Sequence, residues 1–212
     1  MAAVQTVSLS HLPANPLYIA AFRDVKNVSF LRDQLLNANQ EFEYAFVDAT
    51  LIISSTHALA ACFRAINDLN ANRLKTRNVH SEIVFSLSPN NNIAESFRRF
   101  GLSDNTKDIV AIKIGCPDHP HINESSVQNH LSSNVEGITV DFSDATFAET
   151  RDVPRIRKIY KIPDTASAQP KGKKGQKQTN GTSYDAEITK NEVDEIKELE
   201  AVILGMMTLK GS

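Results

Sequence analysis

The sequence predicts a mixed α/β domain followed by a separate C-terminal helix, and three observations support this class. Short apolar segments typical of buried strands alternate with segments whose apolar residues have helical spacing. A polar tract that begins at residue 164 divides this pattern from a final amphipathic segment. The chain has 212 residues, 41% hydrophobic and 23% charged, which are ordinary values for a protein that buries its own core.

Leu17–Phe22 is the first predicted strand, because the segment is short and apolar and follows two prolines. Asn27 is a suitable helix cap, and apolar residues at spacings of three and four predict a helix over residues 28–36. The apolar run Leu51–Ile53 fits either a short strand or a buried approach to the next helix, since three residues carry no periodicity.

A long helix is predicted from an N-cap at Ser55 to about Asn72. Leu59, Phe63 and Ile66 recur there at i, i+4 and i+7, which places them on one helical face. Several alanines stand between them, and alanine has the highest helix propensity of all residues.

The segment His80–Leu87 fits two structures. Its composition favours a strand, while its apolar spacing also allows one or two turns of helix. The run 88–92 must end it, because proline fixes φ and asparagines favour turns. Asn92 and Glu95 have the spacing of an N-cap and its N3 partner, so a further helix is predicted there, with Gly101 just beyond its end.

Two more strands are predicted in the second half of the chain, at Asp108–Ile114 and Gly137–Phe142. The polar stretch between them, residues 115–136, is rich in His, Asn and Ser and is predicted to be mostly loop. A short helix, Arg155–Lys161, follows the last strand.

The chain is therefore divided into a globular domain (residues 1–163), a flexible low-complexity linker (164–188) and an amphipathic helix (189–212) that belongs to the same domain. Apolar residues recur at helical spacing in this last segment: Val193, Ile196, Leu199, Ile203 and Met206. A single amphipathic helix is not stable in water, so it must dock on the domain, on another protein, or on both.

Composition excludes several classes of function. The formal net charge of −2 argues against a protein that binds nucleic acid through its overall charge. No apolar run is long enough to cross a membrane, and no signal peptide is visible. Cys62 and Cys116 share no motif, which excludes a disulfide scaffold or a zinc ribbon and predicts a cytosolic or nuclear location.

Catalytic and metal-binding motifs give no positive signal. His119 and His121 stand near Asp118 and Cys116, but their spacing matches no metal-site template. The chain has no phosphate-binding glycine loop, no HExxH motif and no ordered Ser-His-Asp set. His57, at a helix start, is interpreted as a capping or packing residue.

Three polar segments are candidate binding sites. The cluster Arg73–Arg77 fits either a phosphate site or a helix end whose cations suit the helix dipole. The loop at Asn90–Asn92 opens onto a helix N-terminus, where free N–H groups either hold an anion or simply form a capped turn. The lysines of residues 171–177 fit an RNA contact or a localisation signal, although a solvated linker is the more common reason for such a run.

Several of these segments together resemble one known family. The shared motifs are Phe22-Arg-Asp-Val-Lys-Asn27, Lys75-Thr-Arg77, Ser81-Glu-Ile-Val-Phe-Ser-Leu-Ser-Pro-Asn-Asn-Asn-Ile93, Phe100-Gly101 and Arg157-Lys-Ile-Tyr-Lys161. With the amphipathic C-terminal segment, they resemble the PRPK-binding protein family, the small kinase-binding subunit of the EKC/KEOPS complex. The resemblance covers residues 14–163 and 190–208.

This resemblance implies a small central mixed sheet flanked by helices, with the C-terminal helix packed on the domain. It also implies a non-catalytic protein without cofactor or metal, found in nucleus and cytoplasm. Such a protein binds the N-terminal lobe of a small atypical kinase/ATPase, which in turn holds the subunit that transfers a threonylcarbamoyl group to tRNA. The modified adenosine lies next to the anticodon of tRNAs that read codons starting with A. The family also helps recruit tRNA through its CCA end, and the complex is linked to telomere maintenance and transcription.

The resemblance and the residue chemistry together predict two sets of site residues. The tRNA-binding set is Lys75, Arg77, Asn90, Asn91, Asn92 and Ile93. The kinase-interface set is Leu199, Val202, Ile203, Met206 and Met207. Val202 and Met207 lie beside the main apolar stripe and form a candidate second strip, unless they only widen the face that packs on the domain.

Two alternatives from other classes stay open at this point. The first is a kinase-regulating interaction protein with no direct role in RNA binding. The second is an enzyme that uses Lys75, Arg77 and the asparagine loop on a phosphorylated metabolite.

Overall fold

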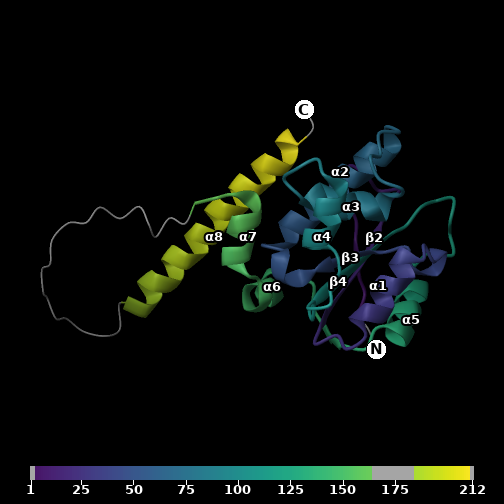
Figure 1. Ribbon diagram of the computed structural model, residues 1–212, viewed down its shortest axis with the longest axis horizontal. Helices are drawn as coiled ribbons and strands as arrows, with labels where there is room; N and C mark the ends of the chain where they lie inside the picture. Colours follow the sequence, from purple (N-terminus) through teal and green to yellow (C-terminus); the bar gives the residue numbers. More distant parts are fainter. Residues whose placement is uncertain (1–2, 164–183, 211–212) are drawn as a thin grey trace, which may run out of the picture.

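The structure is a computed structural model, and it describes residues 3–163 and 184–210. The described chain forms a sheet with helices on both faces, and a long C-terminal helix lies along one side of the molecule (Figure 1). Most of the predicted linker, residues 164–183, lies outside the described residues, so the predicted domain boundary at residue 163 stays a prediction.

Five strands make up the sheet: β1 (Gln5–Val7), β2 (Leu17–Arg23), β3 (Ala45–Asp48), β4 (Ile109–Ile114) and β5 (Ile138–Val140). Their order is β1-β2-β4-β3, and β5 pairs with the second half of β2 beyond the part that β1 covers. The central pair joins β2 and β4 over six residues, from Leu17 opposite Ile114 to Phe22 opposite Ile109.

The predicted mixed α/β class is confirmed, but the expectation of a mixed sheet is wrong in one respect. Every pairing among the described strands is antiparallel. A helix connects β2 to β3, and both strands run antiparallel to β4, so they run in the same direction as each other. They are not neighbours, because β4 lies between them, as in a split βαβ arrangement.

Eight helices are described: α1 (Val28–Leu36), α2 (Ser55–Asn70), α3 (Val79–Leu87), α4 (Ile93–Phe100), α5 (Glu124–Asn134), α6 (Asp144–Thr150), α7 (Val153–Tyr160) and α8 (Tyr184–Leu209). Helices α1 and α5 cover one face of the sheet, and α2, α3, α7 and α8 contribute to the core on the other. Both faces of β2 and β4 are buried, which explains why these strands are continuous apolar runs.

Local sequence predicted the segment before α4 only in part. His80–Leu87 is the helix α3, not a strand, and its N-cap is Asn78, whose side chain accepts a hydrogen bond from the backbone N–H of Ser81 at 2.8 Å. Leu51 ends a short 3-10 helix (Ala49–Leu51) rather than forming a strand, and Ile52 and Ile53 are the buried approach to α2.

Four elements were not predicted: β1, β3, α5 and α6. Residues 115–136 are not mostly loop, because α5 lies within them and is fixed by a capping box between Asn123 and Ser126. Only Val127 and Leu131 of α5 are buried, so its apolar pattern is weak. The edge strand β3, at Ala45–Asp48, was also missed, because it is short and ends in an aspartate.

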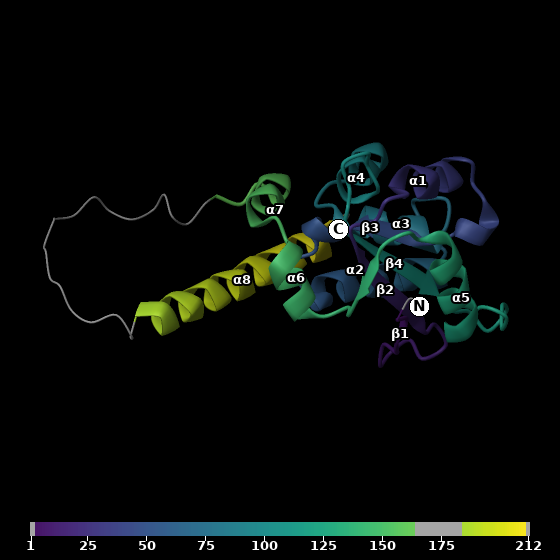
Figure 2. The ribbon, with the colours of Figure 1, turned by 90° about the horizontal axis from the view of Figure 1, so that it is seen from below.

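Helix α8 docks on its own domain, as expected, although it begins at Tyr184 rather than at residue 189. Leu199, Ile203 and Met207 are buried in the core beside α2, while the N-terminal half of α8 projects beyond the body of the domain (Figures 1 and 2). Polar contacts reinforce the docking along its length. The Arg157 guanidinium pairs with Glu195 at 2.5 Å, and the Ser54 hydroxyl donates to Glu200.

Candidate nucleic-acid and kinase interface

The predicted basic cluster lies in the loop between α2 and α3, and a buried carboxylate fixes its backbone. One carboxylate oxygen of Glu82, Oε2, accepts hydrogen bonds from the backbone N–H of Lys75 at 3.0 Å and from that of Thr76 at 2.8 Å. The hydroxyl of Thr76 donates to the same oxygen at 2.6 Å. The backbone of this loop is therefore held from within the domain, while the side chains of Lys75 and Arg77 are exposed.

The cations of this loop are not equivalent. Arg73 forms a salt bridge with Asp68 at 3.0 Å. Within the described residues, neither Lys75 nor Arg77 has a salt-bridge partner, although the Lys75 ammonium lies 5.9 Å from the centre of the Phe85 ring. Lys75 and Arg77 are thus free to pair with an external anion, whereas Arg73 already has its counter-ion.

The asparagine loop lies at the start of α4 and uses its own side chains as caps. Asn92 is the N-cap, as predicted, and its side chain accepts from the backbone N–H of Glu95 at 3.0 Å. The Asn90 side-chain oxygen accepts from the backbone N–H of Asn92 at 3.0 Å. Asn91, Asn92 and Ile93 are exposed and Asn90 is half-buried, so the loop can be reached from solvent. The Glu95 carboxylate pairs with Arg98 and Arg99 instead of closing a capping box.

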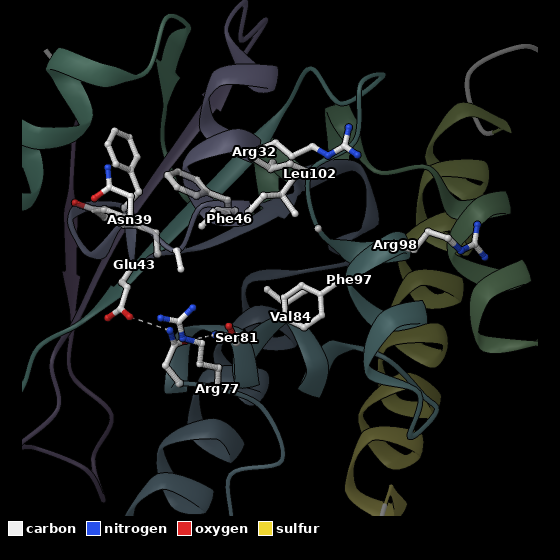
Figure 3. A pocket seen from close by; sticks show the side chains of 17 residues that line it. Arg32, Asn39, Glu43, Phe46, Arg77, Ser81, Val84, Phe97, Arg98 and Leu102 are labelled. Carbon is white, nitrogen blue, oxygen red and sulfur yellow. Dashed lines mark hydrogen bonds between the residues drawn. The ribbon is translucent and has the colours of Figure 1, made fainter.

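The structure does not bring the two halves of the predicted RNA site into one cluster. Lys75 and Arg77 precede α3 and the asparagine loop follows it, and a nine-residue helix is about 13 Å long. A groove of about 500 Å³ lies beside α3, and its lining includes Arg77 but neither Lys75 nor the asparagine loop. Arg77 and Asn78 of the loop before α3 line this groove, together with Ser81 and Val84 of α3 (Figure 3).

Apolar side chains form most of the groove. Val84 of α3 and Phe97 of α4 lie on one side, and Phe46 and Leu102 lie across from them (Figure 3). Ile93 lies four residues before Phe97 on α4, so it continues the same helical face toward the asparagine loop. A groove of this size and apolar character matches the usual dimensions of sites for small ligands, about 300–1,000 Å³.

Arg77 is the cation that this groove offers to a ligand. Arg32 is paired with Asp104 at 2.6 Å, and Arg98 points away from the groove and pairs with Glu95 (Figure 3). Glu43 lies on the same side as Arg77, where it accepts a hydrogen bond from the Asn78 side chain at 3.1 Å. Local sequence carries no signal for Phe46 and Leu102, but a helix over residues 79–87 places Ser81 and Val84 on one face directly after Arg77.

The predicted kinase-interface residues divide into two groups. Leu199, Ile203 and Met207 are buried against the domain and are not available to a partner. Val202 is 47% exposed, so the interpretation that Met207 shares an outer strip with Val202 is wrong for Met207.

Instead, Val202, half-buried Met206 and Leu209, which is 73% exposed, recur at spacings of four and three. We call these three residues the α8 outer face. Leu209 was not among the predicted residues, although its spacing from Val202 is a helical one.

The buried titratable groups serve packing rather than chemistry. His57 is fully buried, and burial lowers its pKa to about 3, so its imidazole is neutral at physiological pH. This agrees with its interpretation as a packing residue.

In the described part of the chain, no three His, Cys, Asp or Glu side chains come close enough to hold a metal ion. None of the described helices combines the length and the apolarity needed to cross a bilayer.

The fold and these surfaces define a class: an α/β binding protein with a groove beside α3 and an apolar outer face on its C-terminal helix. The family described as "Kinase binding protein CGI-121" matches residues 22–211, and the chain belongs to this family.

Curated fungal relatives support the assignment. A protein named "EKC/KEOPS complex subunit cgi121" from Aspergillus terreus is 46% identical over 209 residues, which cover 99% of this chain and 97% of that protein. The protein of the same name from Aspergillus fumigatus is 51% identical over 160 residues, 75% of this chain and 84% of the relative. The one from Schizosaccharomyces pombe is 30% identical over 158 residues, 74% of this chain and 88% of the relative.

Proposed function

We propose that this protein is a non-catalytic subunit of an EKC/KEOPS complex, in which it binds a small atypical kinase/ATPase and helps recruit tRNA through its CCA end. The complex would make threonylcarbamoyladenosine next to the anticodon of tRNAs that read codons starting with A. The names of the relatives support membership in the complex. Location in nucleus and cytoplasm, and the links of the complex to telomeres and transcription, belong to the same proposal.

The observation that carries the RNA part is Arg77, which has no ion-pair partner among the described residues and lies at an apolar groove. A CCA end presents phosphates, ribose hydroxyls and three unpaired bases. Arg77 can hold a phosphate through two parallel hydrogen bonds, and Lys75, two residues before it, can hold another. Half-buried Phe97 offers aromatic surface on which a base can stack.

The asparagine loop would complete the RNA site at the far end of α3. Asn91 and Asn92 present exposed polar groups there, and Ile93, which is 39% exposed, can pack on a base or a ribose. A single strand that lies in the groove and continues beyond Phe97 along α4 to Ile93 would touch both ends of α3. This path explains how two separated clusters can serve one ligand.

The kinase part rests on the α8 outer face. Interfaces have an apolar, tightly packed centre with few charges, and Val202, Met206 and Leu209 offer such a centre on a helix that is already anchored to its domain. Because α8 is held in place by the buried Leu199 and Ile203, little ordering is needed when a partner binds.

Binding of tRNA to the full chain, with and without its CCA end, tests the RNA part. We expect removal of CCA to weaken binding, and Arg77→Glu to weaken it and to reduce the salt dependence by about one phosphate contact. Arg73→Glu is the matched control, because it makes the same charge change in the same loop on an arginine already paired with Asp68. Equal affinities with and without CCA, or equal effects of the two variants, would contradict the RNA part and favour a kinase-regulating protein without an RNA role.

A further inference from the structure

The loop that carries Lys75 and Arg77 is hydrogen-bonded to α3, and the residue that follows α8, Lys210, contacts α3 at Phe85, next to Lys75. We propose that Glu82 and Lys210 are positioning residues for this loop, so that RNA affinity depends on the docked end of α8. This inference rests on the proposed RNA-binding role of Lys75 and Arg77. It assigns a part in RNA binding to Glu82 and Lys210, two residues that lie outside the loop.

Glu82 fixes the loop from α3. Its side chain is only 1% exposed, and the three hydrogen bonds from Lys75 and Thr76 converge on one of its oxygens. Bonds to a charged carboxylate are stronger than bonds between neutral groups, and this carboxylate also lies in the first turn of α3, where negative charge is favoured. The loop backbone is thereby held in one arrangement, with the side chains of Lys75 and Arg77 directed to solvent.

Lys210 reaches the same place from the end of α8. Its side chain is 4% exposed, and its ammonium donates to the backbone carbonyl oxygen of Phe85 and lies 3.3 Å from the centre of the Phe85 ring. The Lys75 ammonium lies 5.9 Å from the centre of the same ring. Phe85 of α3 therefore contacts cations from both segments.

Arg64 of α2 binds the C-terminal end of α8 and so keeps Lys210 close to Phe85. Its guanidinium donates to the backbone carbonyl oxygens of Met207 and Lys210, which are groups that the end of a helix leaves without partners. A cation at this position also suits the dipole of α8. The last turn of α8 is thus bound to α2 through Arg64 and to α3 through Lys210.

Because other charges lie close to Lys210, a phosphate bound at Lys75 should change the pKa of Lys210. Burial, and after it the nearby Arg64 and Lys75, lower the pKa of Lys210 to about 7, while Glu82 acts in the opposite direction. A phosphate bound at Lys75 would offset the repulsion among these three cations. RNA binding should therefore raise the pKa of Lys210, and by linkage the protonated, docked lysine should favour RNA.

Affinity for a tRNA transcript that ends in CCA, measured with the full chain by fluorescence anisotropy, tests this inference. Lys210→Met keeps the length and apolar volume of the side chain but removes the ammonium, and we expect it to weaken binding about fivefold or more. Lys197→Met is the matched control: it makes the same change on an exposed lysine of α8, and we expect less than a twofold effect. Glu82→Gln should weaken binding as well, because it removes the charge that holds the loop.

A second measurement uses the unaltered protein and separates positioning from simple loss of structure. Titration of the Lys210 side chain by NMR should give a pKa near 7 without RNA and a higher pKa with saturating tRNA. Equal affinities of Lys210→Met and Lys197→Met, or a Lys210 pKa that RNA does not change, would overturn the inference while leaving an Arg77-dependent interaction intact. Absence of any tRNA binding by the unaltered chain would overturn the proposed function as well.

Discussion

The imidazole Nε2 of His57 lies 3.0 Å from the hydroxyl oxygen of Tyr160 in the centre of the core. The Tyr160 hydroxyl donates its hydrogen to the backbone carbonyl oxygen of Leu87, so it can only accept from His57. The other ring nitrogen, Nδ1, accepts from the backbone N–H of Ile53 at 3.3 Å. These contacts assign the neutral tautomer with hydrogen on Nε2, and they tie α2 and α7 to the end of α3, directly before the asparagine loop.

Tyr160→Phe should therefore destabilise the domain by about 1–3 kcal/mol, because it leaves the His57 N–H and the Leu87 carbonyl buried without a partner. Urea denaturation followed by circular dichroism measures the change. Tyr18→Phe is the control, since Tyr18 is also buried but its hydroxyl forms no hydrogen bond within the described residues. A Tyr160→Phe protein as stable as the Tyr18→Phe protein would contradict this network.

Stability should fall as the pH falls from about 6.5 toward 3. Burial lowers the pKa of both His57 and His80 to about 3, so in this range the unfolded chain binds protons that the folded chain does not. The free energy of unfolding then rises with pH, by at most about 1.4 kcal/mol per pH unit for each histidine. Urea midpoints measured at pH 7, 6, 5 and 4 test the sign and the size of this slope.

His57→Gln isolates one of the two histidines in that slope. It should lower stability at pH 7, where two hydrogen bonds are disturbed, yet flatten the pH dependence between 6.5 and 3. His121→Gln changes an exposed imidazole and should leave the slope as it is. An unchanged slope in His57→Gln would show that His57 does not stay neutral in the folded protein.

Ala38→Gly should stabilise the protein by about 1 kcal/mol. Ala38 follows the C-cap of α1 with φ 54°, a left-handed conformation in which a Cβ is unfavourable. The backbone N–H of Ala38 donates to the carbonyl oxygen of Leu35, and the backbone N–H of Asn39 donates to that of Gln34. These two bonds form a Schellman motif, in which the residue at the position of Ala38 is usually glycine.

The opposite effect is expected for Ala201→Gly, an exposed position inside α8, where glycine costs about 0.5–1 kcal/mol. Thermal denaturation of both variants gives the comparison. Destabilisation by both glycines would mean that the left-handed backbone at Ala38 is not strained.

Val202→Asp should disrupt binding of the kinase partner and leave the fold intact. Val202 is 47% exposed on the α8 outer face, so a charge there meets water in the free protein but an apolar surface in the complex. Val193→Asp is the matched control on the same helix, at a position that is 52% exposed but outside that face. Co-purification with the kinase that is equal for both variants would exclude the α8 outer face as the interface.

Local sequence was sufficient where a segment has one clear period or one strong cap. The buried strand β2 and the cap of α4 at Asn92 appear where the sequence predicts them, and α2 does so within two residues, with its N-cap at Ser54 rather than Ser55. Lys75, Arg77 and Ile93 are exposed, and their roles in binding stay predictions.

Local sequence was insufficient for α3, because most of its residues are buried and the helix therefore lacks the polar face that shows a helical period. Local sequence was also insufficient to tell which residues of α8 are buried. Met206 and Met207 are neighbours with the same side chain, and only the surface of the domain determines that Met207 is buried and Met206 half-exposed.

The sequence by itself determined the fold class, the family and the residue types available for binding. Only the tertiary structure decided how they are combined: β4 inserted between β2 and β3, a groove that unites Arg77 with Phe46 and Phe97, and Lys210 placed against Phe85. The physical reason is that periods and caps act over a few residues along the chain. Burial, charge and hydrogen bonding in these sites depend instead on segments that meet only when the chain is folded.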